Sequence, residues 1–223
     1  KRLFYLGNRY QCNLCGFRVR KMLSTGHKHQ IFLDNTIIGA GYRNNAVCPI
    51  CYSKDKDRLV YYYLKKYTNI FKDKENVLHI APEGQLRRRI KNNRKINYID
   101  GDINLDYVSN YIDITNIQYD DNYFDYIIIN HVLEHVLDEN KAIMELIRVL
   151  NRNGKLIITV PICLNHEHTF EDNSIVEPKL RMKYFCQEDH VRLYGKDFKQ
   201  RIEKYNVLVQ EFKLNDQEKK LLK

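Results

Sequence analysis

The stretch Phe124-Asp-Tyr-Ile-Ile-Ile-Asn-His-Val-Leu-Glu-His-Val136, followed by Glu145-Leu-Ile-Arg-Val-Leu-Asn-Arg-Asn-Gly-Lys-Leu-Ile-Ile-Thr-Val-Pro161, decides the fold of this chain. Two β-branched apolar runs, Tyr126 to Ile129 and Leu156 to Val160, predict buried strands. Between the two runs, apolar residues recur at helical spacing: Ala142, Ile143, Leu146, Val149 and Leu150. A strand, a helix and a second strand in this order predict a βαβ unit of a parallel sheet.

Four polar residues follow the first of these strands: Asn130, His131, Glu134 and His135. Open α/β sheets bind their ligands outside the carboxyl ends of the strands. The sequence therefore predicts a site with chemistry at this edge of the sheet. For Glu134 and His135 there is an alternative, in which they open the following turn and only fix its conformation.

The same region resembles class I S-adenosylmethionine-dependent methyltransferases of the type 11-like group. In that family an FD-apolar-NHVLEHV strand, a helix ending in RVL and an NG-apolar-VP strand form the second half of the cofactor-binding sheet, and the residues quoted above match these motifs in order. The resemblance extends from about Val77 to the C-terminus. It implies a Rossmann-like α/β fold with a mostly parallel sheet. An antiparallel final strand is expected at Val207 to Leu214.

The first strand, Val77 to Ala81, leads into the first cofactor loop. Methyltransferases usually have a glycine-rich turn here, because a backbone without side chains can approach the cofactor closely. This chain has Ala81-Pro82-Glu83-Gly84, which resembles the HIAPE variant of a subgroup with an N-terminal zinc knuckle. The resemblance implies that Ala81, Glu83 and Gly84 lie against the methionine end of the cofactor, with Glu83 paired to its ammonium group. The alternative is that Glu83 only favours the helix N-terminus through its charge.

Further cofactor contacts are expected at the ends of the next strands. Asp100 and Asp102 follow the second strand, and Asp102 fits better the position of a ribose-binding carboxylate, about 20 residues beyond the first loop. Asp113 and Ile114 resemble the motif that binds the adenine amino group and packs on the ring. The alternative for Asp113 is a cap on the following turn.

The resemblance also implies that Asn130 and His131, at the tip of the fourth strand, complete the cofactor pocket and face the reacting centre. Methyl transfer from a sulfonium requires mainly alignment of the acceptor and exclusion of water, with a general base only for weakly acidic acceptors. His131 is therefore both a cofactor-site and a catalytic candidate.

The run Asp189-His-Val-Arg-Leu-Tyr-Gly195 resembles the DHVR-apolar-YG signature of the same subgroup. It makes His190, Arg192 and Tyr194 the acceptor-side catalytic candidates. Arg192 suits a phosphate or carboxylate, and His190 suits a general base. In the alternative interpretation, His190 and Arg192 pair with Asp189 or Asp197 and only anchor the last helix.

Four of the six cysteines form two pairs with two residues between the thiols, Cys12 with Cys15 and Cys48 with Cys51. Two such turns complete a tetrahedral four-thiolate site, which predicts a structural zinc ribbon. Disulfides fit an intracellular chain poorly, and a degraded or empty site is the other alternative. The 32 residues between the pairs exceed the roughly 15 to 20 of a compact ribbon, so the ribbon is expected to be lengthened between Ser24 and Asn45.

These motifs predict three parts of the chain. Residues 1–56 form the zinc-ribbon module, residues 57–75 a connecting helix and linker, and residues 76–223 the methyltransferase domain. The net charge is +9, and residues 1–75 contain 15 Lys/Arg against 5 Asp/Glu. This basic third suits an anionic partner such as a phosphate, a nucleotide-sugar or RNA, although a solvated lysine-rich surface explains it equally well.

The sequence contains no apolar run near the roughly 18 residues that span a membrane, and we expect a soluble, cytoplasmic protein. The favoured function is methyl transfer from S-adenosylmethionine to an oxygen or nitrogen of a small or saccharide- or phosphate-linked acceptor. The resemblance associates such enzymes with surface-polysaccharide and natural-product biosynthesis. The acceptor, the oligomeric state and the need for a base stay open.

Two other functions compete. An RNA methyltransferase would use the basic zinc module, but the motif after Asn130 lacks the Pro-Pro-aromatic run that stacks a flipped base. A non-catalytic zinc-ribbon adaptor would retain only the cofactor fold. An NAD-dependent enzyme is disfavoured because the Gly-x-Gly-x-x-Gly fingerprint is missing.

Overall fold

The computed structural model describes residues 2–221. Its centre is a five-stranded parallel sheet in the order β10-β9-β6-β7-β8. The strands are β6 (Glu75–Ile80), β7 (Ile96–Asp102), β8 (Asn110–Tyr111), β9 (Phe124–Asn130) and β10 (Leu150–Thr159). This order confirms the Rossmann-like α/β fold and the predicted βαβ unit.

The central strands are buried on both faces, which explains their continuous apolar runs. Successive side chains of a strand point to opposite faces. Val77 and Ile128 accordingly belong to one core cluster, whereas Leu78 and Ile127 belong to the other.

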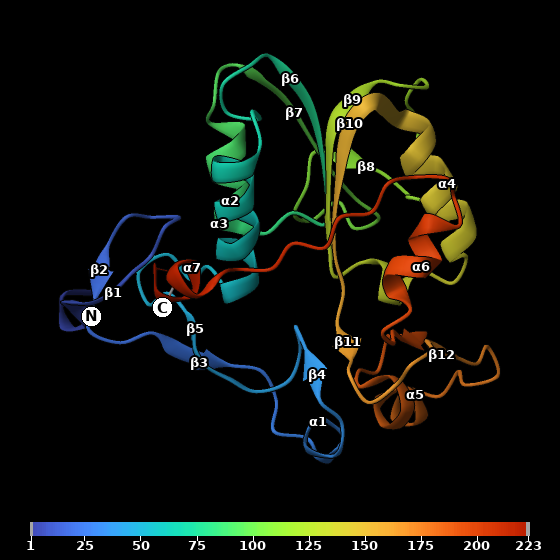
Figure 1. Cartoon of the computed structure of the whole chain (residues 1–223), viewed down its shortest axis with the longest axis horizontal. Coiled ribbons are helices and arrows are strands. Elements are labelled where there is room, and N and C mark those ends of the chain that lie inside the picture. The colour runs from blue at the N-terminus through green and yellow to red at the C-terminus, as the bar shows by residue number, and fades with distance from the viewer. Residues whose placement is uncertain (1, 222–223) are drawn as a thin grey trace.

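Helices cover each face of the sheet (Figure 1). On one face lie α2 (Asp55–Tyr67) and α3 (Gly84–Lys91), and on the other lie α4 (Glu139–Val149) and α6 (Phe198–Glu203). The apolar stripe predicted for 142–150 faces the core, because Ala142, Ile143, Leu146 and Val149 are fully buried. The sheet with its two helical layers positions the carboxyl ends of the strands at one edge.

The N-terminal part consists of η1 (Arg2–Tyr5) and two small antiparallel sheets, β1 (Leu6–Gln11) with β2 (Arg18–Val19) and β3 (Leu23–Thr25) with β5 (Arg43–Val47). The predicted lengthening of the ribbon is the segment between β3 and β5. It contains α1 (Gln30–Asp34) and β4 (Ile37–Ile38).

This excursion of the ribbon reaches the carboxyl edge of the central sheet. There β4 pairs antiparallel with β11 (Ile162–Cys163), the strand that directly follows β10. Ile31, Phe32 and Ile37 pack against the buried Cys163 and Phe185. The N-terminal part therefore contributes one wall of the region beyond the strand ends, as Figure 1 shows below the sheet.

The opposite wall is formed after β11. It comprises β12 (Phe170–Glu171), α5 (Pro178–Phe185) and β13 (Arg192–Leu193), with β12 and β13 paired antiparallel. The short helix η2 (Leu133–His135) follows β9 and lies against β13, since Val191 N donates a hydrogen bond to Glu134 O at 2.9 Å.

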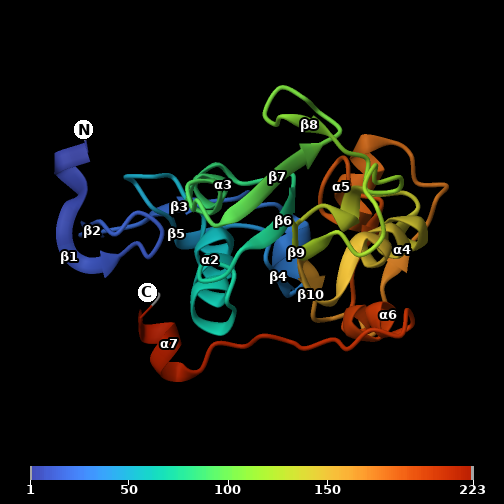
Figure 2. The same cartoon turned by 90° about the horizontal axis from the view of Figure 1, so that it is seen from above.

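The expected antiparallel final strand at 207–214 was wrong. Residues 207–215 pair with no strand of the part of the chain that the structure describes, and they lead to α7 (Asp216–Leu221). The segment returns along the outside of the molecule to α2 (Figures 1 and 2). There the ring of Phe212 lies 5.1 Å from that of Tyr63 and 5.2 Å from that of Tyr67, centroid to centroid. An alternating apolar pattern fits any extended segment that packs on one face. In this protein the segment packs on the tyrosines of α2 and not on the edge of the sheet.

Candidate active site and four-cysteine site

The strands β6 and β9 are neighbours in the sheet, and the chain winds outward from them in opposite directions. Such a switch point opens a crevice beyond the strand ends. The residues that follow the two strands, Ala81 and His131, have φ angles of 47° and 55°. This left-handed conformation costs a residue with a side chain about 1–2 kcal/mol. Backbone strain of this kind is concentrated at ligand sites, so the crevice is the first candidate for a functional site.

Glu83 lies at the start of α3, next to the end of β6. Its Oε2 is 3.1 Å from Nε2 of His79, whereas its buried Oε1 has no hydrogen-bond partner among the described residues. Burial raises the pKa of Glu83, but the hydrogen bond and the charge of His79 outweigh it, so the pKa lies below its ordinary value. The side chain makes no capping bond to α3. A carboxylate with one free buried oxygen fits an ammonium group.

Asn130 stands at the end of the neighbouring strand β9. Its Oδ1 accepts a hydrogen bond from Thr159 Oγ1 at 3.1 Å, and its buried Nδ2 lacks an acceptor within residues 2–221. A Cβ added to Gly84 would meet no atom within 4 Å, so the loop leaves open space there. A free acceptor, a free donor and open space on adjacent strand ends fit the amino and carboxylate groups of a methionine moiety.

The two carboxylates after the second strand have different surroundings. Asp100 is buried and accepts from Arg87 Nε at 2.6 Å and from Ser109 N at 3.0 Å, so it fastens α3 and a loop to the sheet. Within residues 2–221, the Asp102 side chain accepts one hydrogen bond, from Asn104 N to Oδ1 at 2.9 Å. Its second oxygen stays available, as a ribose-binding carboxylate requires.

Asp113 and Ile114 follow β8. Asp113 Oδ1 accepts from both the backbone N and the Oγ1 of Thr115 at 2.8 Å, which is the turn-capping contact of the alternative interpretation. Ile114 is buried in the core cluster on the α4 face. The adenine contact of these two residues stays a prediction.

His131 and Glu134 come together just beyond β9. Nδ1 of His131 lies 3.1 Å from Oε1 of Glu134, an ion-pair distance without hydrogen-bond geometry. Glu134 is only 1% exposed. The sequence placed Glu134 among the polar residues at this strand end, with a turn-fixing role as the alternative, and the structure brings its carboxylate next to His131.

Arg192 and Tyr194 lie inside the protein. Arg192 Nη1 donates to the carbonyl oxygens of Leu133 and Val136 at 2.7 and 2.6 Å, and its Nε donates to Glu171 at 3.0 Å. Tyr194 is fully buried and donates its hydroxyl hydrogen bond to Glu139.

These contacts speak against the expectation that Arg192 and Tyr194 touch an acceptor, because internal partners occupy their polar groups. They hold η2 and α4 in place, whereas the anchoring alternative expected His190 and Arg192 to anchor the last helix. The partners differ from the expected Asp189 and Asp197.

His190 is buried, and its Nδ1 lies 2.9 Å from the carbonyl oxygen of Phe185. Its ring meets that of His135 edge to face, with centroids 4.7 Å apart. Burial and the neighbouring His135 lower the pKa of His190 below its ordinary value. Asp189 faces His135 instead, at 3.1 Å from Nδ1. The structure thus joins His190 to Glu134 and His135, a grouping that spacing in the sequence does not reveal.

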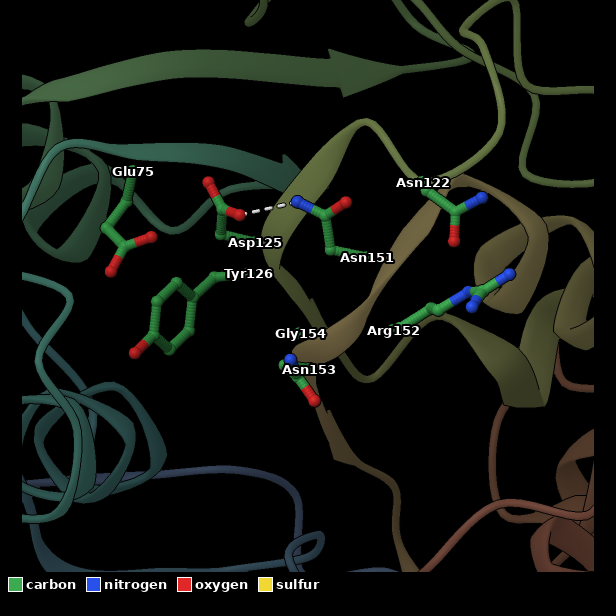
Figure 3. Close-up of a pocket in the computed structure, with 8 residues that line it drawn as sticks. All are labelled: Glu75, Asn122, Asp125, Tyr126, Asn151, Arg152, Asn153 and Gly154. Atoms are coloured by element: carbon green, nitrogen blue, oxygen red, sulfur yellow. Dashed lines mark hydrogen bonds between the residues drawn. The ribbon is translucent and has the colours of Figure 1, made fainter.

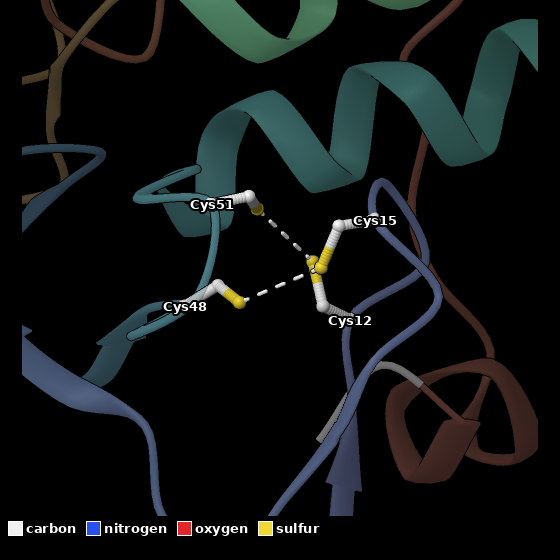
Figure 4. A group of neighbouring side chains, drawn as sticks. All are labelled: Cys12, Cys15, Cys48 and Cys51. Atoms are coloured by element: carbon white, nitrogen blue, oxygen red, sulfur yellow. Dashed lines mark hydrogen bonds between the residues drawn. The ribbon is translucent and has the colours of Figure 1, made fainter. Parts of the chain in front are cut away.

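The four cysteines of the two pairs meet at one point (Figure 4). The Sγ atoms of Cys12 and Cys51 lie 3.7 Å apart, and those of Cys15 and Cys48 lie 3.8 Å apart. A tetrahedral zinc ion with Zn–S bonds near 2.3 Å requires sulfur atoms roughly 3.8 Å apart, whereas a disulfide requires about 2.05 Å. The geometry fits the expected four-thiolate site and not a disulfide.

The two knuckle turns have the same backbone geometry. Gly16 N donates to Cys12 O at 2.7 Å, and Tyr52 N donates to Cys48 O at 2.8 Å. The residue after each pair is left-handed, with φ of 79° at Gly16 and 61° at Tyr52. Tyr52 thus adopts a conformation that usually favours glycine, and the second knuckle turn forms with a tyrosine at this position.

Two hollows are lined by residues other than those of the crevice. One of about 510 Å³ is at the amino ends of β6 and β9, where Figure 3 shows Asn151 hydrogen-bonded to Asp125. We do not associate it with catalysis, because ligands of this fold bind at the opposite edge. The other, of about 570 Å³, lies between α1 and α5. It is lined by His29, Gln30, Ile31, Asp34, Asn35, Lys179, Met182, Lys183 and Glu188.

None of the helices within the described residues is long and apolar enough to cross a membrane. Residues 66–158 match a family model described as a methyltransferase domain. A search of curated proteins found no match.

Similar solved structures include the 4+2 cyclase SpnF, with 15% identity, 70% of this chain and 59% of that chain covered, and a TM-score of 0.53. An S-adenosylmethionine-dependent methyltransferase from Archaeoglobus fulgidus has 18% identity, coverage of 70% and 69%, and a TM-score of 0.45. The PH0226 protein from Pyrococcus horikoshii OT3 has 21% identity, coverage of 66% and 77%, and a TM-score of 0.44. The chain spans 59% of the length of the first similar structures.

Identities this low speak for the fold alone, and the cyclase demonstrates that this fold also occurs in a protein named for another reaction. The assignment of the domain therefore rests on the family model together with the strand order. The matched residues begin within α2 and end within β10, so they include β6, β7, β8 and β9 in full and β10 as far as Ile158. Residues 66–158 of this chain thus match a methyltransferase domain, and they form most of its Rossmann-like parallel sheet.

Proposed function

We propose that this protein transfers a methyl group from S-adenosylmethionine to an oxygen or nitrogen of a small or saccharide- or phosphate-linked acceptor. The observation that carries the proposal is the pair of buried polar atoms without partners in the described chain, Glu83 Oε1 and Asn130 Nδ2, at adjacent strand ends. Buried polar atoms are nearly always hydrogen-bonded, so a missing partner at this crevice points to a ligand.

The residues that would hold the cofactor follow from this geometry. Glu83 would accept from the ammonium group, Asn130 would donate to the methionine carboxylate, and Asp102 would accept from the ribose hydroxyls. When bound, the sulfonium supplies an activated methyl carbon. The chain then needs to align the acceptor and keep water out.

His131 is the residue best placed to handle a proton. Its Nδ1 lies beside Glu134, so the carboxylate would hold the tautomer in which Nδ1 is protonated and Nε2 is free. Nε2 would accept the proton of an acceptor hydroxyl as methyl transfer proceeds. His190, Arg192 and Tyr194 would act by positioning η2 and α4.

The acceptor would enter between the ribbon excursion and α5. A Cβ added to Gly39 would lie 3.3 Å from Cε1 of His131, so the excursion closes over the strand tip. The hollow between α1 and α5 combines lysines, carboxylates and side-chain amides. A mixed polar lining suits a hydroxyl-rich acceptor with a phosphate or carboxylate, which supports a role in surface-polysaccharide or natural-product biosynthesis. A cytoplasmic location is part of this proposal, because a four-thiolate site without disulfides suits a reducing compartment.

RNA is the second candidate acceptor, and the basic charge of residues 1–75 favours it. An RNA substrate would bind with an affinity that falls steeply with salt. Weak binding that is independent of salt would exclude this candidate.

The experiment that tests the proposal is calorimetric titration with S-adenosylmethionine. We expect Glu83→Gln to weaken binding at least tenfold, because an amide cannot neutralise an ammonium group. Glu75→Gln, at the other end of the same strand, is the matched control and should bind as the wild type does. Equal affinity in the wild type and Glu83→Gln, or no heat at all with the wild type, would overturn the proposal, and the latter result would favour the non-catalytic adaptor.

A further inference from the structure

Three side chains with metal-binding atoms meet beside the proposed reaction centre. Glu134 and His135 come from η2, and His190 comes from the loop before β13. One ligand atom from each residue lies within 4.8 Å of those of the other two. The four-cysteine site is a different group, so this cluster is separate from the zinc ribbon.

Both imidazoles are oriented by their Nδ1 atoms. Nδ1 of His190 lies 2.9 Å from Phe185 O, and Nδ1 of His135 lies 3.1 Å from Oδ2 of Asp189. Each contact favours a proton on Nδ1, which leaves the lone pair of Nε2 free. Histidines that bind a metal are held in this way, with one ring nitrogen on a carbonyl or carboxylate and the other on the ion.

The carboxylate of Glu134 lacks hydrogen-bond donors. Neither carboxylate oxygen has a hydrogen bond among the described residues, although the side chain is almost fully buried. Nδ1 of His131 lies near Oε1 of Glu134. The negative charge of Glu134 acts on Lys56 at a distance, but the two side chains form no ion pair. A buried carboxylate without donors is strongly destabilising unless a cation compensates it.

We propose that Glu134, His135 and His190 bind a divalent transition-metal ion through one carboxylate oxygen and two imidazole Nε2 atoms. Two nitrogen ligands and one oxygen ligand suit Zn²⁺, Fe²⁺ or Mn²⁺, whereas Mg²⁺ and Ca²⁺ prefer oxygen alone. Three protein ligands leave positions open for water or for an oxygen of a further molecule. The side chain of His135 is 31% exposed, which gives the ion a route from solvent.

The role of the ion, unlike its binding, rests on the proposed function. Glu134 connects the cluster to His131, so the ion would lie next to the acceptor. A hydroxyl that binds the ion becomes more acidic and is held in place for methyl transfer. The acceptor class would then be one with oxygen atoms able to coordinate, such as a vicinal diol or a hydroxy acid.

The test is a titration of the full-length protein with Zn²⁺, followed by calorimetry and thermal unfolding, after a weak chelator has removed loosely bound ions. We expect one ion to bind beyond that of the cysteines. Glu134→Gln and His135→Ala should each weaken this second site at least thirtyfold. His168→Ala is the matched control, because its imidazole is 89% exposed and lies outside the cluster.

Thermal unfolding keeps the test decisive if the affinities are hard to resolve. Added Zn²⁺ should raise the Tm of the wild type and of His168→Ala, but not that of Glu134→Gln, which has no buried charge to compensate. A folded wild type with no second ion, or a second site unchanged in Glu134→Gln and His135→Ala, would overturn the proposal. Binding of S-adenosylmethionine is measured independently, so loss of the ion site and failure of the proposed function give different results.

Discussion

Three of the non-glycine residues with the strained left-handed backbone conformation adopt it for different reasons. Ala81, His131 and Tyr52 all have positive φ. The first two stand at the crevice, where a ligand contact would justify the strain, whereas Tyr52 only closes a knuckle turn. A glycine substitution at Tyr52 should therefore relieve the strain without loss of ligand binding, whereas Ala81 and His131 lie where a ligand would bind.

Tyr52→Gly should stabilise the protein by about 0.5–1 kcal/mol, because glycine adopts the left-handed conformation without the side-chain penalty and loses part of that gain to unfolded-state entropy. The Tyr52 side chain is 67% exposed, so little packing is lost. Urea unfolding measures the change. The reciprocal variant Gly16→Ala has open space for its methyl group and should lose about 1 kcal/mol. A destabilised Tyr52→Gly would contradict this account of the knuckle.

Asp57→Asn should stabilise the protein at neutral pH. Burial and the charge of Glu83 raise the pKa of Asp57 from 3.8 to about 6. The folded protein therefore binds this proton more tightly than the unfolded chain, and stability falls as the pH rises from about 4 to 6. The amide avoids this loss, and its oxygen can keep the 2.7 Å bond from Lys54 N. We expect a gain of about 1–2 kcal/mol at pH 7 and none at pH 4.

The control is Asp55→Asn, which should change the stability in the opposite direction. Burial raises the pKa of Asp55, but the hydrogen bond and charge of Arg43 outweigh it, so the pKa lies below 3.8. Asp55→Asn should therefore destabilise the protein at pH 7, and this loss should diminish as the pH falls below 4. Chemical unfolding across pH 4 to 7 follows both variants, and parallel pH profiles would refute the assignment of the two carboxylates.

Among the secondary-structure elements, α2 connects the most distant parts of the chain. It follows the second knuckle, covers the face of the sheet beside α3, and receives the C-terminal segment on its tyrosines. Glu218 accepts a hydrogen bond from Tyr62 at 3.0 Å and pairs with Lys66 at 2.6 Å. The C-terminal segment is therefore fastened by α2 and not by the sheet.

Phe212→Ala should loosen this attachment by about 1 kcal/mol, the scale of an aromatic pair. Hydrogen exchange and proteolysis of residues 207–221 should become faster, while the central strands stay protected. Leu208→Ala lies in the same segment with a side chain that is 86% exposed, and it should leave both rates unchanged. Faster exchange in β6 or β9 would instead show that the segment supports the sheet itself.

At the scale of the whole molecule, the cysteine site and the crevice are connected through the ribbon excursion. β4 pairs with β11, and Gly39 lies next to the ring of His131. The free energy of zinc binding at the cysteines would add to the stability of the folded ribbon, because the unfolded chain has no preformed site. Loss of the ion should therefore also loosen the contacts of the ribbon excursion with β11 and His131.

Zinc removal, or Cys48→Ser, should release the ribbon and lower the Tm, and hydrogen exchange at β4 and β11 should increase. Binding of S-adenosylmethionine should persist, since Glu83, Asp102 and Asn130 belong to the sheet. For the Tm alone, Cys163→Ala is the control for loss of a buried thiol outside the site, because Cys163 itself belongs to β11. A Tm and exchange pattern unaffected by a strong zinc chelator would contradict the structural role of the ion.

Local patterns were sufficient for much of the fold and part of the site. The βαβ unit, the strand-end positions of Glu83 and Asn130, and the four cysteines follow from runs and spacings that neighbouring residues set. The final strand was wrong, and Arg192 and Tyr194 lie buried with internal partners, because an apolar alternation or a polar side chain does not reveal which surface it will face.

The sequence by itself determined the parallel sheet and the thiolate geometry, since burial on both faces requires continuous apolar runs and a chelating turn requires two thiols three positions apart. Only the tertiary structure decided that Glu134, His135 and His190 meet, that β4 pairs with β11, and that the C-terminal segment lies on α2. These contacts join residues up to 156 positions apart. Such pairings leave no periodic signal, because they depend on how finished elements pack and not on the local conformation of the backbone.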